Sequence, residues 1–101
     1  HMGTQWLMNL ALVNGKVDKS DSAFANLRKI LANNIVYYRL KCGWSQEDLA
    51  EKLGTTTTYL STLENAKRNT SIDYIEHLSN ILNVQLSQLL EVRDPIENRR
   101  I

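Results

Sequence analysis

The stretch SQEDLAEKLGTTTTYLSTLENAKRN, residues 45–69, predicts two short helices joined by a tight turn at Gly54. Glycine can adopt the positive φ of such a turn without steric strain. Four consecutive threonines, Thr55–Thr58, follow the turn. Threonine is a mediocre helix former, because its β-branch restricts χ1 and its hydroxyl competes for backbone partners. The run therefore needs an explanation other than helix formation.

The first segment of this stretch predicts a helix that begins at Ser45. Ser45 is an N-cap residue, and Asp48 stands three positions later, close to a capping box. Leu49, Ala50 and Leu53 then share one face at helical spacing. Ala50 is small at the position where the two helices cross, so the helices can approach closely.

The second segment predicts a helix that ends near Asn65. Leu60 and Leu63 lie one turn apart and face the core. Two short helices with a glycine turn between them and apolar residues at these offsets form the helix-turn-helix pattern.

The other helical patterns predict an all-α chain with five helices in total. A helix from about Ser22 to Gly43 carries the apolar residues Phe24, Leu27, Leu31, Ile35 and Tyr38, with Ser20, Asp21 or Ser22 as its cap. A fourth helix begins near Thr70 or Ser71, carries Ile75, Leu78, Ile81 and Leu82, and stops at Asn83. A fifth, short helix covers about Leu86 to Leu90.

The chain is divided into an N-terminal extension (1–22), a helix-turn-helix domain (23–91) and a charged tail (92–101) that is expected to be frayed or extended. His1-Met2 is interpreted as a residual expression tag. Asn14-Gly15 fits either a hairpin turn or a helix cap, and the flanking valines favour extended structure. The apolar run Trp6–Val13 is too short to span a membrane, so no membrane partner and a cytoplasmic location are expected.

Composition restricts the class of function. The net charge is only +1, but residues 28–68 hold seven Lys/Arg against four Asp/Glu, which weakly suggests a face for an anionic partner. Cys42 is the only cysteine, and its apolar neighbours predict a structural role. His77 has no Cys or second native His near it, so no metal site is expected. No nucleophile with a base, phosphate loop or carboxylate dyad is recognisable, so neither an enzyme nor a cofactor is expected.

Residues 31–90, LANNIVYYRLKCGWSQEDLAEKLGTTTTYLSTLENAKRNTSIDYIEHLSNILNVQLSQLL, resemble the phage-repressor (Cro/C1, XRE-type) helix-turn-helix family. The resemblance is carried by SQEDLA, the Gly54 turn, YLSTLENAKRN and LNVQLSQLL. It implies a five-helix domain that binds double-stranded operator DNA as a symmetric homodimer. Thr70 stands where the family often has proline, and the segment before residue 30 is additional, which bears on how the chain dimerises.

The resemblance gives the threonines separate predicted roles. Thr55 or Thr56 caps the recognition helix. Such a helix presents its N-terminal residues to base edges in the major groove, where threonine offers a methyl group to thymine and a hydroxyl that donates or accepts. The predicted base-contacting residues are Thr57, Thr58, Ser61 and Thr62. A merely solvated polar face is the other interpretation, and the absence of charge between Thr55 and Leu63 counts against it.

Phosphate contacts are expected to flank the base contacts, from Ser45, Gln46, Thr55, Asn65, Lys67 and Arg68. Ser45 and Gln46 open a helix whose free N–H groups and positive dipole end favour an anion. Lys67 and Arg68 follow the recognition helix as a basic loop, and ordinary surface charge explains them equally well. Tyr59 is interpreted as covering the helix junction rather than reaching a phosphate.

By the same resemblance, Arg39 late in the first helix forms a structural ion pair with Glu64 late in the recognition helix. Two unrelated surface charges are the alternative, and the adjacent core positions favour the pair. Trp44 occupies an apolar position of the family pattern and is predicted to belong to the core.

These observations predict a transcriptional regulator that binds a pseudo-palindromic operator as a homodimer; a repressor, a restriction-modification controller and an antitoxin all fit. The dimer surface is either the last helix (Leu86, Leu89, Leu90) or the run Trp6–Val13. The alternative is a protein-interaction module with the same fold that does not bind DNA, which the sparse charge on the recognition helix favours.

Overall fold

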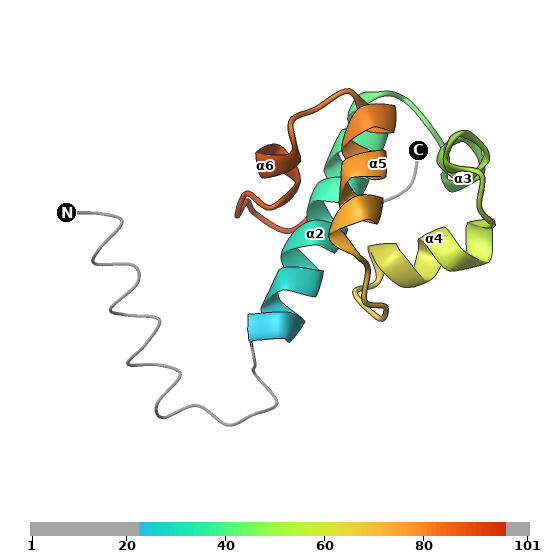
Figure 1. Ribbon diagram of the computed structural model, residues 1–101. Coiled ribbons are helices and arrows are strands. Elements are labelled where there is room, and N and C mark those ends of the chain that lie inside the picture. Colours follow the sequence, from blue (N-terminus) through green and yellow to red (C-terminus); the bar gives the residue numbers. More distant parts are fainter. Residues whose placement is uncertain (1–22, 97–101) are drawn as a thin grey trace, which may run out of the picture.

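The computed structural model describes residues 23–96, and every regular element among them is a helix (Figure 1). The helices are α2 (Ala23–Lys41), α3 (Gln46–Leu53), α4 (Thr57–Glu64), α5 (Ile72–Leu82) and α6 (Leu86–Leu89). The predicted all-α class with five helices is confirmed. The expectations for the cap at residues 20–22, for Trp6–Val13 and for Asn14-Gly15 fall outside the described residues.

The long helix α2 and helix α5 pack against each other in the middle of the domain. Figure 1 shows α3 and α4 on one side of this pair and α6 on the other. Helix α4 packs against both α2 and α3, while α6 packs against α2 and α5. The first turns of α2 project beyond the other helices in this view.

The helix ends lie where the sequence predicts them. Ser45 caps α3, and its hydroxyl accepts a hydrogen bond from the backbone N–H of Asp48, whose carboxylate accepts one from the backbone N–H of Ser45. Gly54 ends α3 at φ 76°, the left-handed conformation that glycine adopts most readily. Of the two threonines predicted as the cap of α4, Thr56 is the residue that caps the helix. Ser71 caps α5.

Every helix contributes at least one fully buried aliphatic side chain to the core. These side chains include Ile35, Leu49, Leu60, Leu78 and Leu89, all 0 % exposed. Burial of one such side chain is worth about 1.5–3 kcal/mol, and the set therefore holds the five helices to one another. Trp44 is half-buried and packs against this core, as predicted.

Two expectations are wrong, and one apolar residue of α2 is open to solvent. That residue is Leu27, which belongs to the apolar stripe of the helix and is 47 % exposed. Cys42 is a free, exposed thiol in the turn after α2, so its apolar neighbours do not enclose it. Leu89 is a core residue of the domain and is therefore unavailable to a dimer surface.

The segment that follows α6 is tied to α2 up to Ile96. The buried side-chain amide of Asn34 donates to the carbonyl oxygens of Leu89 and Glu91, each at 2.7 Å. Its oxygen accepts a hydrogen bond from the Arg93 Nε at 2.6 Å. Residues 91–96 form no helix or strand, and their hydrogen bonds to α2 show that this part of the tail is not frayed.

Asn33 and Arg93 extend the same attachment. The amide of Asn33 donates to the carbonyl oxygen of Asp94 at 3.0 Å, and its oxygen accepts from the backbone N–H of Ile96 at 2.8 Å. The Arg93 guanidinium lies 4.1 Å from the centre of the Tyr37 ring, a cation–π distance. The contacts of α2 therefore continue past the domain boundary that the sequence placed at residue 91.

Replacing Asn34 with Ala is expected to lower the free energy of unfolding by about 1–3 kcal/mol, because it leaves carbonyl oxygens next to the core without a partner. Urea denaturation followed by circular dichroism measures this loss. Asn33→Ala is the matched control, since one of its bonds is fully exposed and water can replace it. Equal losses in the two variants would contradict the special role of the buried amide.

Candidate nucleic-acid interface

Helix α4 presents an uncharged polar face. Thr57 and Thr58 are exposed in its first turn, and Ser61 and Thr62 are half-buried one turn later. The single acid of the helix, Glu64, is buried. The exposed part of α4 therefore consists of hydroxyl groups and methyl groups, which can read base edges but cannot attract an anion by charge.

Thr55 and Asn65 lie at the two ends of this helix. Thr55 is half-buried, and its backbone N–H donates to the Ala50 carbonyl oxygen at 2.9 Å, so it belongs to the turn rather than to the cap. The Asn65 side-chain amide bends back onto α4 and donates to the Ser61 carbonyl oxygen at 2.8 Å. Asn65 is exposed and borders the predicted face.

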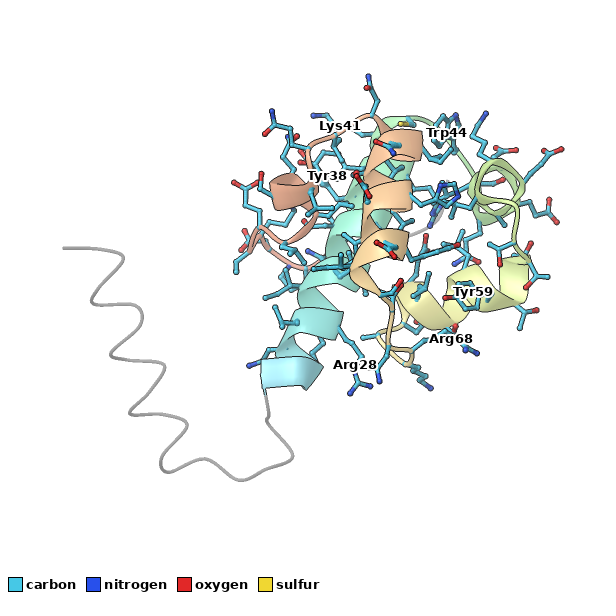
Figure 2. The ribbon with its side chains drawn as sticks, viewed as in Figure 1. Arg28, Tyr38, Lys41, Trp44, Tyr59 and Arg68 are labelled. Atoms are coloured by element: carbon cyan, nitrogen blue, oxygen red, sulfur yellow. The ribbon has the colours of Figure 1, made fainter. Side chains whose placement is uncertain are left out.

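Arg68 is held against α4 rather than extended into solvent. Its Nε donates to the Thr62 hydroxyl oxygen at 2.9 Å, and its guanidinium carbon lies 4.7 Å from the centre of the Tyr59 ring. Figure 2 shows the side chains of Tyr59 and Arg68 on the same edge of the domain. The Thr62 hydroxyl in turn donates to the Tyr59 carbonyl oxygen at 2.6 Å. Thr62, a predicted base contact, and Arg68, a predicted phosphate contact, are therefore neighbours.

Tyr59 covers the junction between α4 and α5. Its ring meets that of Tyr74 edge to face, with centres 5.7 Å apart, and it packs on the core. Burial raises the pKa of Tyr74 above its usual value of 10.0, and the neighbouring Tyr59 raises it further. This position agrees with the predicted junction role of Tyr59.

The start of α3 holds a carboxylate of its own. The backbone N–H of Ser45, and then its hydroxyl, hold the pKa of Asp48 below its usual value of 3.8. Gln46 turns toward the core side and donates from its amide to Glu64 Oε1 at 2.8 Å. A phosphate at this helix end would therefore meet the charge of Asp48, and the backbone N–H groups there are its best donors.

Arg39 and Glu64 form the ion pair that the family resemblance predicted. Arg39 Nε lies 2.7 Å from Glu64 Oε2 and Arg39 Nη2 lies 3.1 Å from Oε1, a bidentate arrangement. Both side chains are nearly inaccessible, at 3 % and 2 % exposure. Arg39 Nη1 also donates to the Trp44 carbonyl oxygen at 2.9 Å. The pair thus joins α2, the loop before α3 and the end of α4.

Two contacts of these residues escaped the sequence reasoning. The hydrogen bond from Gln46 to Glu64 joins the first turn of α3 to the last turn of α4, and no local pattern indicates it. Arg68 lies in the loop after α4, as predicted, but the sequence did not indicate that its side chain packs on α4. The contact of Arg68 with Thr62 could have been inferred only from their spacing of six residues, because a chain that turns back after a helix can place such residues side by side.

The helix-turn-helix model named HTH_3 matches residues 35–89, which include the whole of α3, α4, α5 and α6. The chain belongs to the HTH_3 helix-turn-helix family. This confirms the resemblance to the phage-repressor type. The HTH_3 family is one of transcriptional regulators rather than enzymes, in agreement with the absence of a predicted enzymatic activity.

Two relatives and one solved structure illustrate the similarity. The chain is 38 % identical to the HTH-type transcriptional regulator SinR of Bacillus licheniformis over 69 residues, which are 67 % of this chain and 62 % of SinR. It is 33 % identical to the control protein C.SmaI of Serratia marcescens over 81 residues, which are 80 % of this chain and 95 % of that protein. The crystal structure of the hypothetical transcription factor NHTF from Neisseria superposes with a TM-score of 0.62 at 37 % identity, covering 74 % of this chain and 80 % of that one.

The described part of this HTH_3 protein contains neither a membrane-spanning helix nor a metal site. No helix between residues 23 and 96 combines the length and apolar character needed to cross a membrane. In the same range, no three His, Cys, Asp or Glu side chains are grouped so as to hold a metal ion. His77, instead, lies with its Nε2 3.1 Å from the Leu53 carbonyl oxygen and so links α5 to the end of α3.

A double-mutant cycle on Arg39 and Glu64 is expected to show strong coupling. Either single change to Ala leaves a buried charge without its partner, which costs about 3–5 kcal/mol. The double variant should lose far less than the sum of the two single losses in free energy of unfolding, measured by urea denaturation. Glu91→Ala removes the exposed ion pair with Arg93 and should cost about 1 kcal/mol or less. Additive losses at residues 39 and 64 would contradict the coupling.

Proposed function

We propose that this protein is a transcriptional regulator that binds double-stranded DNA in a sequence-specific way as a homodimer. The observation that carries the proposal is the exposed face of α4, which offers hydroxyl and methyl groups at the N-terminal end of the recognition helix and no charge. SinR is described as an HTH-type transcriptional regulator and C.SmaI as a control protein, and both descriptions agree with the proposal. The proposed location is the cytoplasm, where DNA is accessible to such a regulator.

Base reading is proposed for Thr57, Thr58, Ser61 and Thr62. Each side chain carries a hydroxyl that donates or accepts a hydrogen bond in the major groove. The threonine methyl groups fit the C5-methyl of thymine. Thr58 is the best single test, because it is exposed and no described residue is hydrogen-bonded to its side chain in the structure.

Backbone contacts are proposed for Ser45, Gln46, Thr55, Asn65, Lys67 and Arg68. Lys67 and Arg68 supply the positive charge that α4 lacks. Since the Arg68 guanidinium is fixed by Thr62 and Tyr59, it is oriented before DNA arrives, and less side-chain entropy is lost on binding. At Gln46 the backbone N–H is the proposed donor, because the side-chain amide is bonded to Glu64.

The proposed dimer surface surrounds α6. Leu86, Leu90 and Val92 are exposed at 38 %, 39 % and 70 %, unusual values for aliphatic side chains that follow one another so closely. One recognition helix buries too little surface for tight specific binding, and a second copy at a half-site about one helical turn away supplies the rest. The operator is accordingly a pseudo-palindrome.

Selection of bound sequences from random duplex DNA tests the proposal as a whole. Enrichment of an inverted repeat is the expected result. If no sequence is enriched and DNA binding stays weak at low salt, the domain is a protein-interaction module with the same fold. The low charge of α4 would then explain the weak binding to DNA.

Arg68→Ala and Thr58→Ala are expected to affect DNA binding differently. Loss of the Arg68 charge should weaken binding on every sequence and reduce the salt slope by about one unit. Loss of the Thr58 side chain should relax preference at one base pair by about 1–3 kcal/mol at most. Titrations on cognate and scrambled duplexes at several salt concentrations measure both effects. Lys41→Ala is the control for the loss of one positive charge anywhere on the domain. Figure 2 shows Lys41 at one end of α2, whereas Arg28 and the Arg68 side chain lie toward the opposite end.

Leu90→Asp is expected to shift the protein toward monomer in sedimentation at micromolar concentration, because a carboxylate would enter an apolar contact. Ile72→Asp is the matched control, since Ile72 is 73 % exposed and lies at the start of α5. A wild-type protein that remains monomeric with and without DNA would contradict dimerisation. If the Leu90→Asp variant dimerises normally, the dimer interface does not include the surface around α6.

A further inference from the structure

A hollow of about 420 Å³ lies between α2, the end of α4 and the segment after α6. Its apolar walls come from Ile30 and Ala32 of α2, Ala66 beyond α4, and Pro95 and Ile96. The volume lies within the range of sites that hold small ligands or a few side chains. The other lining residues are polar or charged: Lys29, Asn33, Glu64, Asn65 and Arg93. The accessible surface of the hollow is nevertheless mostly apolar, so apolar side chains are its best-matched occupants.

Leu27 continues this apolar surface toward the start of α2. It lies one helical turn before Ile30, so the two side chains are neighbours on the helix surface. Leu27 is 47 % exposed, although it belongs to the apolar stripe of α2. The exposed apolar surface therefore runs from the hollow to the point where the preceding chain enters the helix.

The chain itself contains a segment that matches this surface. Residues 6–13, WLMNLALV, are apolar at every position except Asn9. Nine residues separate Val13 from Ala23, the first residue of α2. They can span up to about 30 Å when extended. Ile30 lies only about 10 Å along the helix from Ala23, so the segment can reach the hollow without strain.

The other end of the chain is a poorer match. Residues 97–101, ENRRI, follow Ile96 directly, but three of the five are charged. Burial of three charges against the alanine and isoleucine side chains of the hollow carries a desolvation cost. The apolar N-terminal segment has no such cost.

We propose that Trp6–Val13 docks in the hollow between α2, the end of α4 and residues 95–96 of the same molecule. The docked segment would cover Leu27 and Ile30 and would contact the last turn of the recognition helix, because Glu64 and Asn65 border the hollow. The segment is then an internal brace of the domain. The proposal does not depend on DNA binding or on dimerisation.

Tryptophan fluorescence tests this docking in the full chain. Trp44→Phe leaves Trp6 as the sole tryptophan. Emission at shorter wavelength than in urea, with weaker quenching by acrylamide than for a peptide of residues 3–22, is expected. Both signals should be independent of protein concentration. If Trp6 is quenched as strongly as in the peptide, the proposal is wrong. If the protection of Trp6 rises with protein concentration, the segment docks on a second molecule and the intramolecular form of the proposal is wrong.

A charge placed in the hollow locates the docking site. Ile96→Asp in the Trp44→Phe background should return Trp6 emission and quenching to the values of the peptide. The backbone N–H of Ile96 that binds Asn33 is retained in this variant. Ile72→Asp is the matched control, since Ile72 is 73 % exposed and is not part of the hollow. Protection of Trp6 that survives Ile96→Asp, or that is lost equally in Ile72→Asp, would place the segment elsewhere.

Disulfide formation supplies a second measurement that requires no change to an apolar wall. In a Cys42→Ser background, Met8→Cys combined with Lys29→Cys should oxidise readily to an intramolecular disulfide, because Lys29 is exposed and borders the hollow. Met8→Cys combined with Lys52→Cys, on α3, should not. Equal rates of oxidation in the two pairs would overturn the proposal.

Discussion

The contact between Arg39 and Glu64 is the constraint on which the orientation of the recognition helix depends. Two charges removed from water are stable only when hydrogen bonds satisfy their remaining donors and acceptors. Here the guanidinium bonds both carboxylate oxygens and the Trp44 carbonyl, and Gln46 adds a further donor to the carboxylate. These partners come from α2, from the loop before α3, from α3 itself and from α4. An altered angle of α4 would break several bonds at once, so the buried pair Arg39 and Glu64 fixes how the threonines of α4 are presented.

The four threonines show how one residue type serves different purposes within a single turn of chain. Thr55 completes the turn, Thr56 caps the helix, and Thr57 and Thr58 stand exposed at its start. The low helix propensity of threonine matters little here, because the cap and the buried leucines of α4 supply the stability. The exposed side chains of Thr57 and Thr58 are therefore not needed for the stability of α4.

The sequence predicted features that depend on neighbours along the chain. The glycine at residue 54, the serine and threonine caps and the periodicity of the leucines each act within one or two helical turns, and these elements lie where they were expected. The errors concern contacts between distant residues. Cys42 and Leu27 have apolar neighbours in sequence but are exposed, since the course of the rest of the chain decides what covers them. The attachment of residues 91–96 to Asn33 and Asn34, and that of Arg68 to Thr62, follow from packing that periodicity does not encode.

The attachment of the last segment to Asn34 has a consequence for the order in which the domain forms during synthesis. Asn34 is synthesised before its backbone partners at Leu89 and Glu91, which follow 55 and 57 residues later. Until they emerge, the amide has no counterpart, and the face of α2 around it would bury a polar group at a cost if it packed prematurely. Contacts of such large sequence separation slow folding, because a long loop must close before they form. Packing of this face of α2 is therefore favourable only once residues 89–91 are available to accept the hydrogen bonds of the amide.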